Sequence, residues 1–246
     1  MPVVPAAPRY WFWSHDIAPD QMADLAMPGM RLQRLVNYRR GEQAARRFAA
    51  LYYDDDGAIA PSRGWIVDAD ADAAAAHGSW AAGVSVDVVP GDGDVRFTLI
   101  VEPQPNPARS LHADLSAAAL TELLDGGHVV VDLATYLRDG TRVFAAVVES
   151  GAQHDGCFFP ALGQDEVRTT LGPRGVLPTR VRAYHSPAGW RLAVAGVRVR
   201  GTSWSVHADI DADDVSSRLE QRRAYPLDLD AVGHGLSVRF ALVAAA

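Results

Sequence analysis

The chain contains no lysine, and all 23 of its basic residues are arginines. This absence excludes three lysine-dependent sites: the P-loop that binds nucleotide phosphates, the Schiff base of pyridoxal phosphate enzymes, and the Ser-x-x-Lys pair of β-lactamases. Arginine still forms ion pairs, and its planar head recognises carboxylates.

Cysteine, long apolar runs and a leader signal are also scarce or missing. The single cysteine, Cys157, excludes an intrachain disulfide and a multi-cysteine zinc site. No apolar run approaches the roughly 18 residues that span a bilayer. The first residues lack the basic start and apolar core of a signal peptide, and the net charge of −7 disfavours nucleic acid and anionic membranes. We therefore expect a cytoplasmic protein with neither nucleic acid nor a membrane as partner; its oligomeric state is left open.

What the sequence does contain is a five-fold internal repeat. Its marker is a residue pair, usually arginine and an aromatic, that opens an apolar run: Arg47-Phe48, Arg96-Phe97, Val143-Phe144, Arg191-Leu192 and Arg239-Phe240. The second residues of these pairs are 49, 47, 48 and 48 positions apart. Such a period indicates one supersecondary unit stacked on its own copies.

Each unit reads as a short helix, a strand, a glycine turn, an apolar second strand and a third strand. Ser116, Asp211 and Asp72 are the expected helix N-caps, and Pro19 suits a first helical position. The second strand is apolar nearly throughout, which predicts a central position in its sheet.

The two ends of the chain carry complementary pieces of this unit. A strand at 9–15 lacks its own hairpin, and a hairpin at 226–244 lacks a third strand. We therefore predict an α+β fold: a closed, propeller-like ring with five-fold pseudosymmetry, in which the N-terminal strand closes the ring with the C-terminal hairpin. An open arc of the same repeats is the alternative. The expected single domain, 1–246, has units near 17–70, 71–114, 115–162, 163–209, and 210–246 completed by 9–16.

The third strands supply the candidate ligand-binding residues. Their expected segments, 11–16, 65–70, 109–114, 157–162 and 204–209, alternate between a buried face and a polar face. The candidates on the polar face are Ser14, Asp16, Asp68, Asp70, His112, Asp114, His207 and Asp209. Trp190, beside a turn, is added as a ligand-stacking tryptophan because it is the one expected to be exposed.

The recurring aspartates, Asp16, Asp70, Asp114 and Asp209, have two interpretations. A ring of carboxylates around an axis would hold a cation or a polycationic ligand. Alternatively, each carboxylate accepts main-chain N–H bonds or pairs with a recurring arginine such as Arg47, Arg96, Arg191 or Arg239. One such residue in every repeat favours the structural role.

His112 and His207 replace serine or aspartate at equivalent positions of two repeats. Together with Asp68 they would supply acid–base catalysis, or a zinc site, if the fold brought them together. Because they are two repeats apart, surface histidines without a joint role are favoured.

The segments Trp11-Phe-Trp-Ser-His15, Met30-Arg-Leu-Gln-Arg-Leu-Val-Asn-Tyr38 and Arg47-Phe-Ala-Ala-Leu-Tyr52 carry a resemblance to a known family. They resemble the bacterial tandem repeat of the N-terminal domain of polyglycine hydrolase-like proteins. That unit looks like Trp-x-x-x-His, a helix, a strand ending in Gly-Tyr, and Arg-Tyr-Ala-Ala. The resemblance implies a repeat scaffold; the serine-hydrolase domain that accompanies it in that family has no room and no lysine in this chain.

Because no catalytic motif of known spacing is present, we expect a non-catalytic recognition module. It would bind a small molecule, a glycan or a peptide at the axial or loop-rich end of the ring, without metal or cofactor. The alternative is a small-molecule lyase, cyclase or hydrolase that uses His112, His207 and Asp68.

Overall fold

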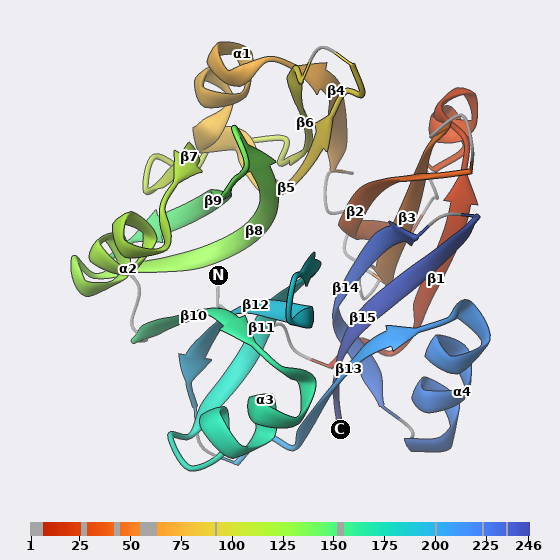
Figure 1. Ribbon diagram of the computed structural model, residues 1–246, viewed down its shortest axis with the longest axis vertical. Coiled ribbons are helices and arrows are strands. Elements are labelled where there is room, and N and C mark those ends of the chain that lie inside the picture. Colours follow the sequence, from red (N-terminus) through yellow and green to blue (C-terminus); the bar gives the residue numbers. More distant parts are fainter. Residues whose placement is uncertain are drawn as a thin grey trace.

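The computed structural model describes residues 7–25, 29–41, 45–54, 63–91, 93–151, 155–199, 201–222, 224–234 and 236–246. These residues form five three-stranded sheets with short helices (Figure 1). The first sheet has β1 (Trp11–Ile17), the 3-10 helix η1 (Pro19–Leu25), β2 (Met30–Arg40) and β3 (Ala45–Asp54). The second has β4 (Gly64–Ala69), α1 (Ala71–Ala76), η2 (Gly78–Trp80), β5 (Ala81–Val88) and β6 (Val95–Val101).

The remaining three sheets follow the same plan. The third has β7 (Arg109–Leu115), α2 (Ala117–Asp125), β8 (His128–Arg138) and β9 (Thr141–Ser150). The fourth has β10 (Gly156–Leu162), α3 (Gln164–Leu171), β11 (Val176–Ser186) and β12 (Gly189–Arg198). The fifth has β13 (Trp204–Ile210), α4 (Ala212–Arg222), β14 (Tyr225–His234) and β15 (Ser237–Ala245).

Every sheet is antiparallel, and its last strand in the sequence lies in the middle. The orders are β1-β3-β2, β4-β6-β5, β7-β9-β8, β10-β12-β11 and β13-β15-β14. The prediction that the apolar run after each marker pair is the central strand is confirmed. The first strand of each unit is the outer one, the second is the inner one, and the helix between them lies on the outside of the molecule (Figure 1).

The expected unit boundaries and the expected closure by strand exchange are wrong. Trp11 of β1 pairs with Tyr53 of β3, whereas β13 completes the last hairpin through Trp204 and Ala245. Each outer strand therefore belongs to the hairpin that follows it, not to the one that precedes it. β1 still lies against the last sheet, because the Trp13 ring meets the Phe240 ring edge-on, 5.5 Å between centroids.

The helices begin at polar residues for the expected reason, with one correction. The side chains of Ser116 and Asp211 accept the N–H bonds of Ala119 and Asp214, at 3.1 and 2.9 Å. In the second unit the N-cap is Asp70, whose carboxylate accepts from Ala73 N at 2.8 Å, and not Asp72. Asp70 is therefore occupied by the helix that it starts.

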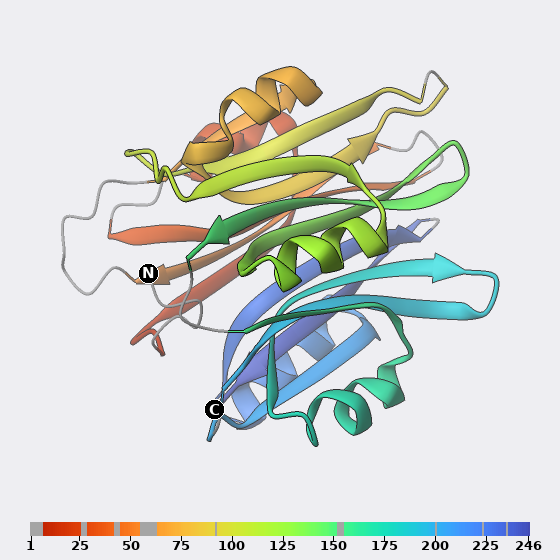
Figure 2. The same cartoon turned by 90° about the vertical axis from the view of Figure 1, so that its left-hand side faces the viewer.

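The inner strands are neighbours in succession: β2 lies against β5, β5 against β8, β8 against β11, β11 against β14, and β14 against β2. Figure 1 shows the five sheets around a common centre, and in Figure 2 the β8–β9 and β11–β12 hairpins extend toward the same side. Each inner strand is the edge of its sheet, so the main-chain groups along that edge need partners from elsewhere.

Side chains of neighbouring sheets supply these partners. Ser85 Oγ accepts from Asn37 N at 3.0 Å, and Asp132 Oδ2 accepts from Val84 N at 2.7 Å. Asp228 Oδ2 accepts from Val181 N at 2.7 Å. The last two contacts run from arginine to carbonyl: Arg182 donates to Leu133 O, and Arg34 donates to Leu229 O at 3.3 Å. All five pairs of neighbouring inner strands are thereby bridged.

Candidate functional site

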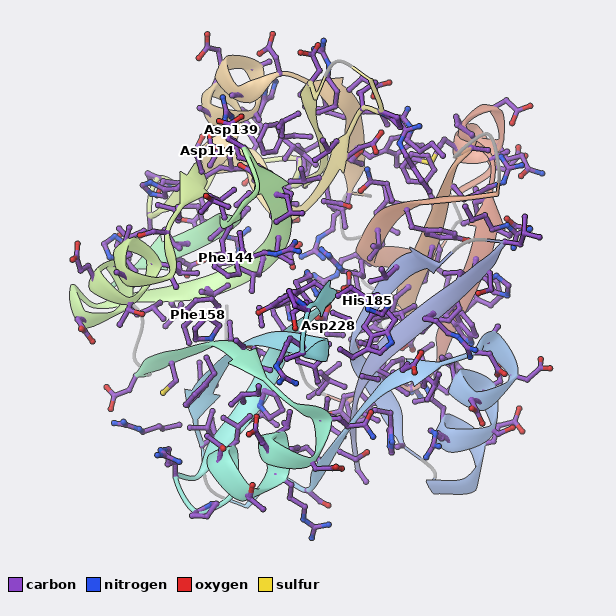
Figure 3. All side chains as sticks on the ribbon, viewed as in Figure 1. Asp114, Asp139, Phe144, Phe158, His185 and Asp228 are labelled. Atoms are coloured by element: carbon purple, nitrogen blue, oxygen red, sulfur yellow. The ribbon has the colours of Figure 1, made fainter. Side chains whose placement is uncertain are left out.

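A pocket lies between the inner strands at the centre of the molecule. Its volume is about 390 Å³, and its lining comes from β2, β5, β8, β11 and β14, with Arg142 added from β9. The lining begins at Arg34 and follows the strands toward their hairpin turns. Figure 3 places His185 and Asp228 near this centre and Asp114 and Asp139 away from it. None of the predicted ligand-binding residues lines the pocket.

A buried network of alternating charges, which we call the floor, lies beneath the pocket, and its two arginines, Arg34 and Arg182, line the pocket itself. Asp132 pairs with Arg34 and, at 2.5 Å, with Arg182. Asp228 pairs with Arg182 at 2.6 Å and lies 3.7 Å from Arg34 Nε. The side chains of these four residues are at most 3% exposed. They come from β8, β2, β11 and β14, so the network joins four sheets at one level.

The charges hold each other in the ionised state. Burial alone would raise the pKa of Asp132, but Arg34, Arg182 and Arg180 outweigh it and lower that pKa below its usual value. Removing one member of such a network would leave an uncompensated charge in the interior. We therefore expect this floor to be rigid.

Asp230 is the exception among the buried carboxylates. It lies two residues after Asp228 on the same strand, lines the pocket and is 5% exposed. Burial raises its pKa to about 6, although Arg182 and Arg34 act against that shift. Its Oδ2 accepts from Ala183 N at 2.8 Å. The protonated form of this carboxylate is therefore favoured up to a higher pH than that of an exposed aspartate.

One wall of the pocket carries an ion pair between the first two sheets. Arg39 donates to the two oxygens of Asp87 from Nε and Nη2, at 2.7 and 2.6 Å. Below it, Asn37 and Ser85 bind each other through their side chains. This wall is polar, and the charges on it are neutralised.

The opposite wall carries stacked side chains. Arg142 Cζ lies 4.4 Å from the centroid of the Tyr184 ring, and the Tyr184 hydroxyl donates to Pro160 O at 2.8 Å. The exposed His185 ring lies 4.1 Å from the Trp190 ring at an interplanar angle of 43°. Trp190 is half-buried and takes part in the site only as support for His185, which lines the pocket.

One repeat position contributes most of the floor, and it had a detectable signal. Each inner strand has a bulge, and the residue that follows it is Arg34, Gly83, Asp132, Arg180 and Asp228 in the five sheets. The backbone position is the same in all five sheets, whereas the residue is arginine in two of them, aspartate in two and glycine in one. Charges that alternate with apolar residues in mid-strand at the 48–49-residue period were visible in the sequence. Our prediction instead looked for functional residues on the outer strands, where His112 and His207 replace the serine or aspartate of other repeats.

Four of the predicted carboxylates lie on the outer strands, at positions where the backbone is left-handed. Asp16, Asp68, Asp114 and Asp209 have positive φ angles of 61°, 61°, 54° and 55°, each beside the bulge of its strand. The alignment of the second repeat is thus corrected by two residues, because Asp68, and not Asp70, is equivalent to Asp16. Aspartate tolerates this left-handed conformation better than most residues.

Each of these carboxylates has a partner within reach. Asp16 binds Arg40 at 3.0 Å and Arg47 at 3.2 Å, and Asp209 lies 3.5 Å from Arg239. Asp68 binds Arg46, and Asp114 binds Arg138 at 2.7 Å. Of the recurring arginines suggested by the sequence, Arg47 and Arg239 pair with these aspartates as expected, whereas Arg96 pairs with Asp94 instead. These contacts support the structural interpretation of the recurring aspartates.

The predicted histidine pair does not come together. His112 lies on β7 and His207 on β13, which are outer strands of two sheets that are not neighbours. His112 Nε2 is 2.9 Å from Ser110 Oγ, and His207 Nε2 is 3.2 Å from Ser205 Oγ. Burial and the nearby His128 lower the pKa of His112. Ser14 occupies the equivalent position on β1, paired with Ala50 of β3.

Among the residues that the structure describes, no group of three or more histidine, cysteine, aspartate or glutamate side chains is arranged to hold a metal ion. None of the helices in those ranges has both the length and the apolar character that a membrane crossing requires. Comparison of the sequence with protein-family models and with curated proteins gives no match. The axial pocket is therefore interpreted from its own geometry.

Proposed function

We propose that the chain is a non-catalytic recognition module in which five sheets form one closed, five-fold pseudosymmetric ring, and in which the axial pocket binds a small molecule. The observation that carries this proposal is the lining of the pocket: all five inner strands contribute to it. The contact of β14 with β2 supports closure, since these strands belong to the last and first sheets.

The size of the pocket favours a small molecule over a glycan chain or a peptide. A volume of about 390 Å³ falls within the range of roughly 300–1,000 Å³ that is typical of small-molecule sites. It equals the volume of about a dozen water molecules at ~30 Å³ each. A polymer would have to remain mostly outside the pocket.

The chemistry of the lining supports binding rather than turnover. The lining residues Arg34 and Arg182 are held in place by the buried carboxylates of Asp132 and Asp228, and the lining residue Asp87 is paired with Arg39. Groups fixed in this way orient a ligand at low entropic cost. The histidines on which a catalytic alternative rested lie on outer strands and do not line the pocket.

The test is a binding screen with two matched variants. Leu137 and Leu236 are both exposed, at 49% and 75%, and of the two only Leu137 lines the pocket. A library of small molecules is screened by thermal shift and calorimetry against the wild type, Leu137→Trp and Leu236→Trp. We expect ligands that Leu137→Trp weakens and Leu236→Trp does not. Ligands that bind all three proteins equally, or none at all, would contradict the proposal.

A further inference from the structure

The arginines that line the axial pocket differ in their partners. Arg34 is paired with Asp132, Arg39 with Asp87, and Arg182 with Asp132 and Asp228. Arg142 also lines the pocket, but no ion pair with a carboxylate occurs for it within the described part of the chain. Within the part of the chain that the structure describes, Arg142 is therefore the lining guanidinium without a carboxylate partner.

The surroundings of Arg142 fix how that charge is presented. The Tyr184 ring covers one face of the guanidinium, and the hydrogen bond from the Tyr184 hydroxyl to Pro160 O holds the ring in place. Stacking leaves the N–H groups at the edge of the guanidinium plane available. Burial lowers the pKa of Arg142, as expected for a cation with part of its hydration removed. Such a cation gains most from an anion that restores its lost hydrogen bonds.

We infer that the ligand of the axial pocket is a small carboxylate and that Arg142 binds its carboxylate group through paired N–H···O bonds. This inference rests on the proposed function of the pocket. A planar carboxylate matches the fork of a guanidinium, and its single negative charge matches the single positive charge of Arg142. A phosphate dianion would leave one negative charge uncompensated in a pocket that is also lined by Asp230. A cationic ligand would face an uncompensated arginine.

The rest of the ligand is constrained by the residues beside Arg142. Leu137 lies on the neighbouring strand position, paired with Arg142, and Val36 and Val232 line the pocket as well. These side chains fit a compact apolar body attached to the carboxylate. The volume limits that body to about the size of a substituted aromatic ring or a small amino-acid derivative.

The experiment compares acids with their uncharged counterparts. Benzoate, 4-hydroxyphenylacetate, N-acetylglycine and N-acetylphenylalanine are each titrated by calorimetry beside the corresponding primary amide, at neutral pH. The proteins are the wild type, Arg142→Gln and Arg174→Gln. Arg174 is exposed, donates to Thr170 O at 2.6 Å and does not line the pocket. Arg174→Gln therefore makes the same change in net charge as Arg142→Gln but leaves the pocket unaltered.

We expect at least one acid to bind the wild type and Arg174→Gln about tenfold or more tightly than its amide, as a charged hydrogen-bonded pair requires. Arg142→Gln is expected to lose that preference. Tyr184→Phe, which keeps the ring, should retain it, and Tyr184→Leu should reduce it. Circular dichroism establishes that each variant is folded.

Two outcomes overturn the inference in distinguishable ways. If no acid is preferred over its amide, or if Arg142→Gln keeps the preference, Arg142 does not select a carboxylate. If neutral molecules nevertheless bind and Leu137→Trp weakens them, the pocket still functions as a binding site. If neither acids nor neutral molecules distinguish Leu137→Trp from the wild type, the proposed function fails together with the inference.

Discussion

Gly233 of β14 packs directly on the main chain of Arg39 of β2. A Cβ atom added to Gly233 would lie 1.5 Å from the Arg39 carbonyl oxygen. The last and the first sheets therefore approach each other as closely as backbones allow, and only glycine fits at this position.

We expect Gly233→Ala to destabilise the protein by about 3 kcal/mol or more, because the clash is with main chain and cannot be relieved by a rotamer change. Urea unfolding measures this change. Gly64→Ala is the control, since its added Cβ would meet only the end of the Val101 side chain, at 3.3 Å. Equal stability of the two variants would show that β14 and β2 do not make this contact in solution.

Because Asp132 belongs to the charge network below the pocket, we expect Asp132→Asn to lower the free energy of unfolding strongly. An asparagine still accepts the N–H bond of Val84, but it leaves Arg34 and Arg182 without a full counter-charge. A buried pair broken on one side costs about 3–5 kcal/mol. Denaturant midpoints of the variant and the wild type give this difference.

Asp155→Asn serves as the comparison for Asp132→Asn. Asp155 pairs with Arg198 at 3.3 Å, with side chains 75% and 59% exposed, and an exposed pair contributes at most about 1 kcal/mol. A loss of similar size in both variants would contradict the interpretation of the network as a rigid floor.

Asp230 predicts a pH dependence of stability with a definite sign. Its pKa is about 6 in the folded protein and near 3.9 in an unfolded chain, so between these values the folded state binds more protons. The contribution of Asp230 to the free energy of unfolding therefore falls as pH rises from 4 to 6, by up to about 3 kcal/mol. Below pH 4 the penalty is absent.

Asp230→Asn removes this titration. We expect the stability of the wild type relative to Asp230→Asn to decrease as the pH is raised from 4 to 7, measured by urea unfolding at each pH. A constant difference between the wild type and Asp230→Asn would show that Asp230 is already ionised at pH 4.

We expect substitution of His112 or His207 to lower stability without changing the binding of a ligand in the axial pocket. His112→Ala and His207→Ala each remove a side chain that contacts a serine on its own strand, which costs about 1 kcal/mol. Their affinity for any ligand of the axial pocket should equal that of the wild type in calorimetry. A loss of affinity in either variant would show that the outer strands take part in ligand binding.

The repeat, the central strands and most helix starts could be predicted because they depend on local patterns. An apolar run after each marker pair requires burial on both faces wherever the run is placed. Ser116 and Asp211 satisfy the first N–H groups of the helices that follow them, whatever the rest of the fold. The recurring aspartates could likewise be assigned a structural role from their repetition alone, and Asp16, Asp114 and Asp209 do pair with arginines.

The phase of the repeat could not be predicted in the same way. A period gives the spacing of the units, but a unit that begins with the outer strand and one that ends with it produce the same periodic sequence. Which hairpin Trp11 joins was decided by hydrogen bonding to β3 in three dimensions. The contact of Trp13 with Phe240 brings β1 close to the last sheet without making it part of that sheet.

The pocket was decided by tertiary structure alone. Arg34, Asp132, Arg182 and Asp228 are 46 to 98 residues apart along their contacts, and no local pattern says that four strands present them at one level. The sequence determined which segments become strands, because alternation and burial are properties of neighbouring residues. Only the stacking of the sheets determined which charges meet, because buried ions select partners by distance in space and not by distance along the chain.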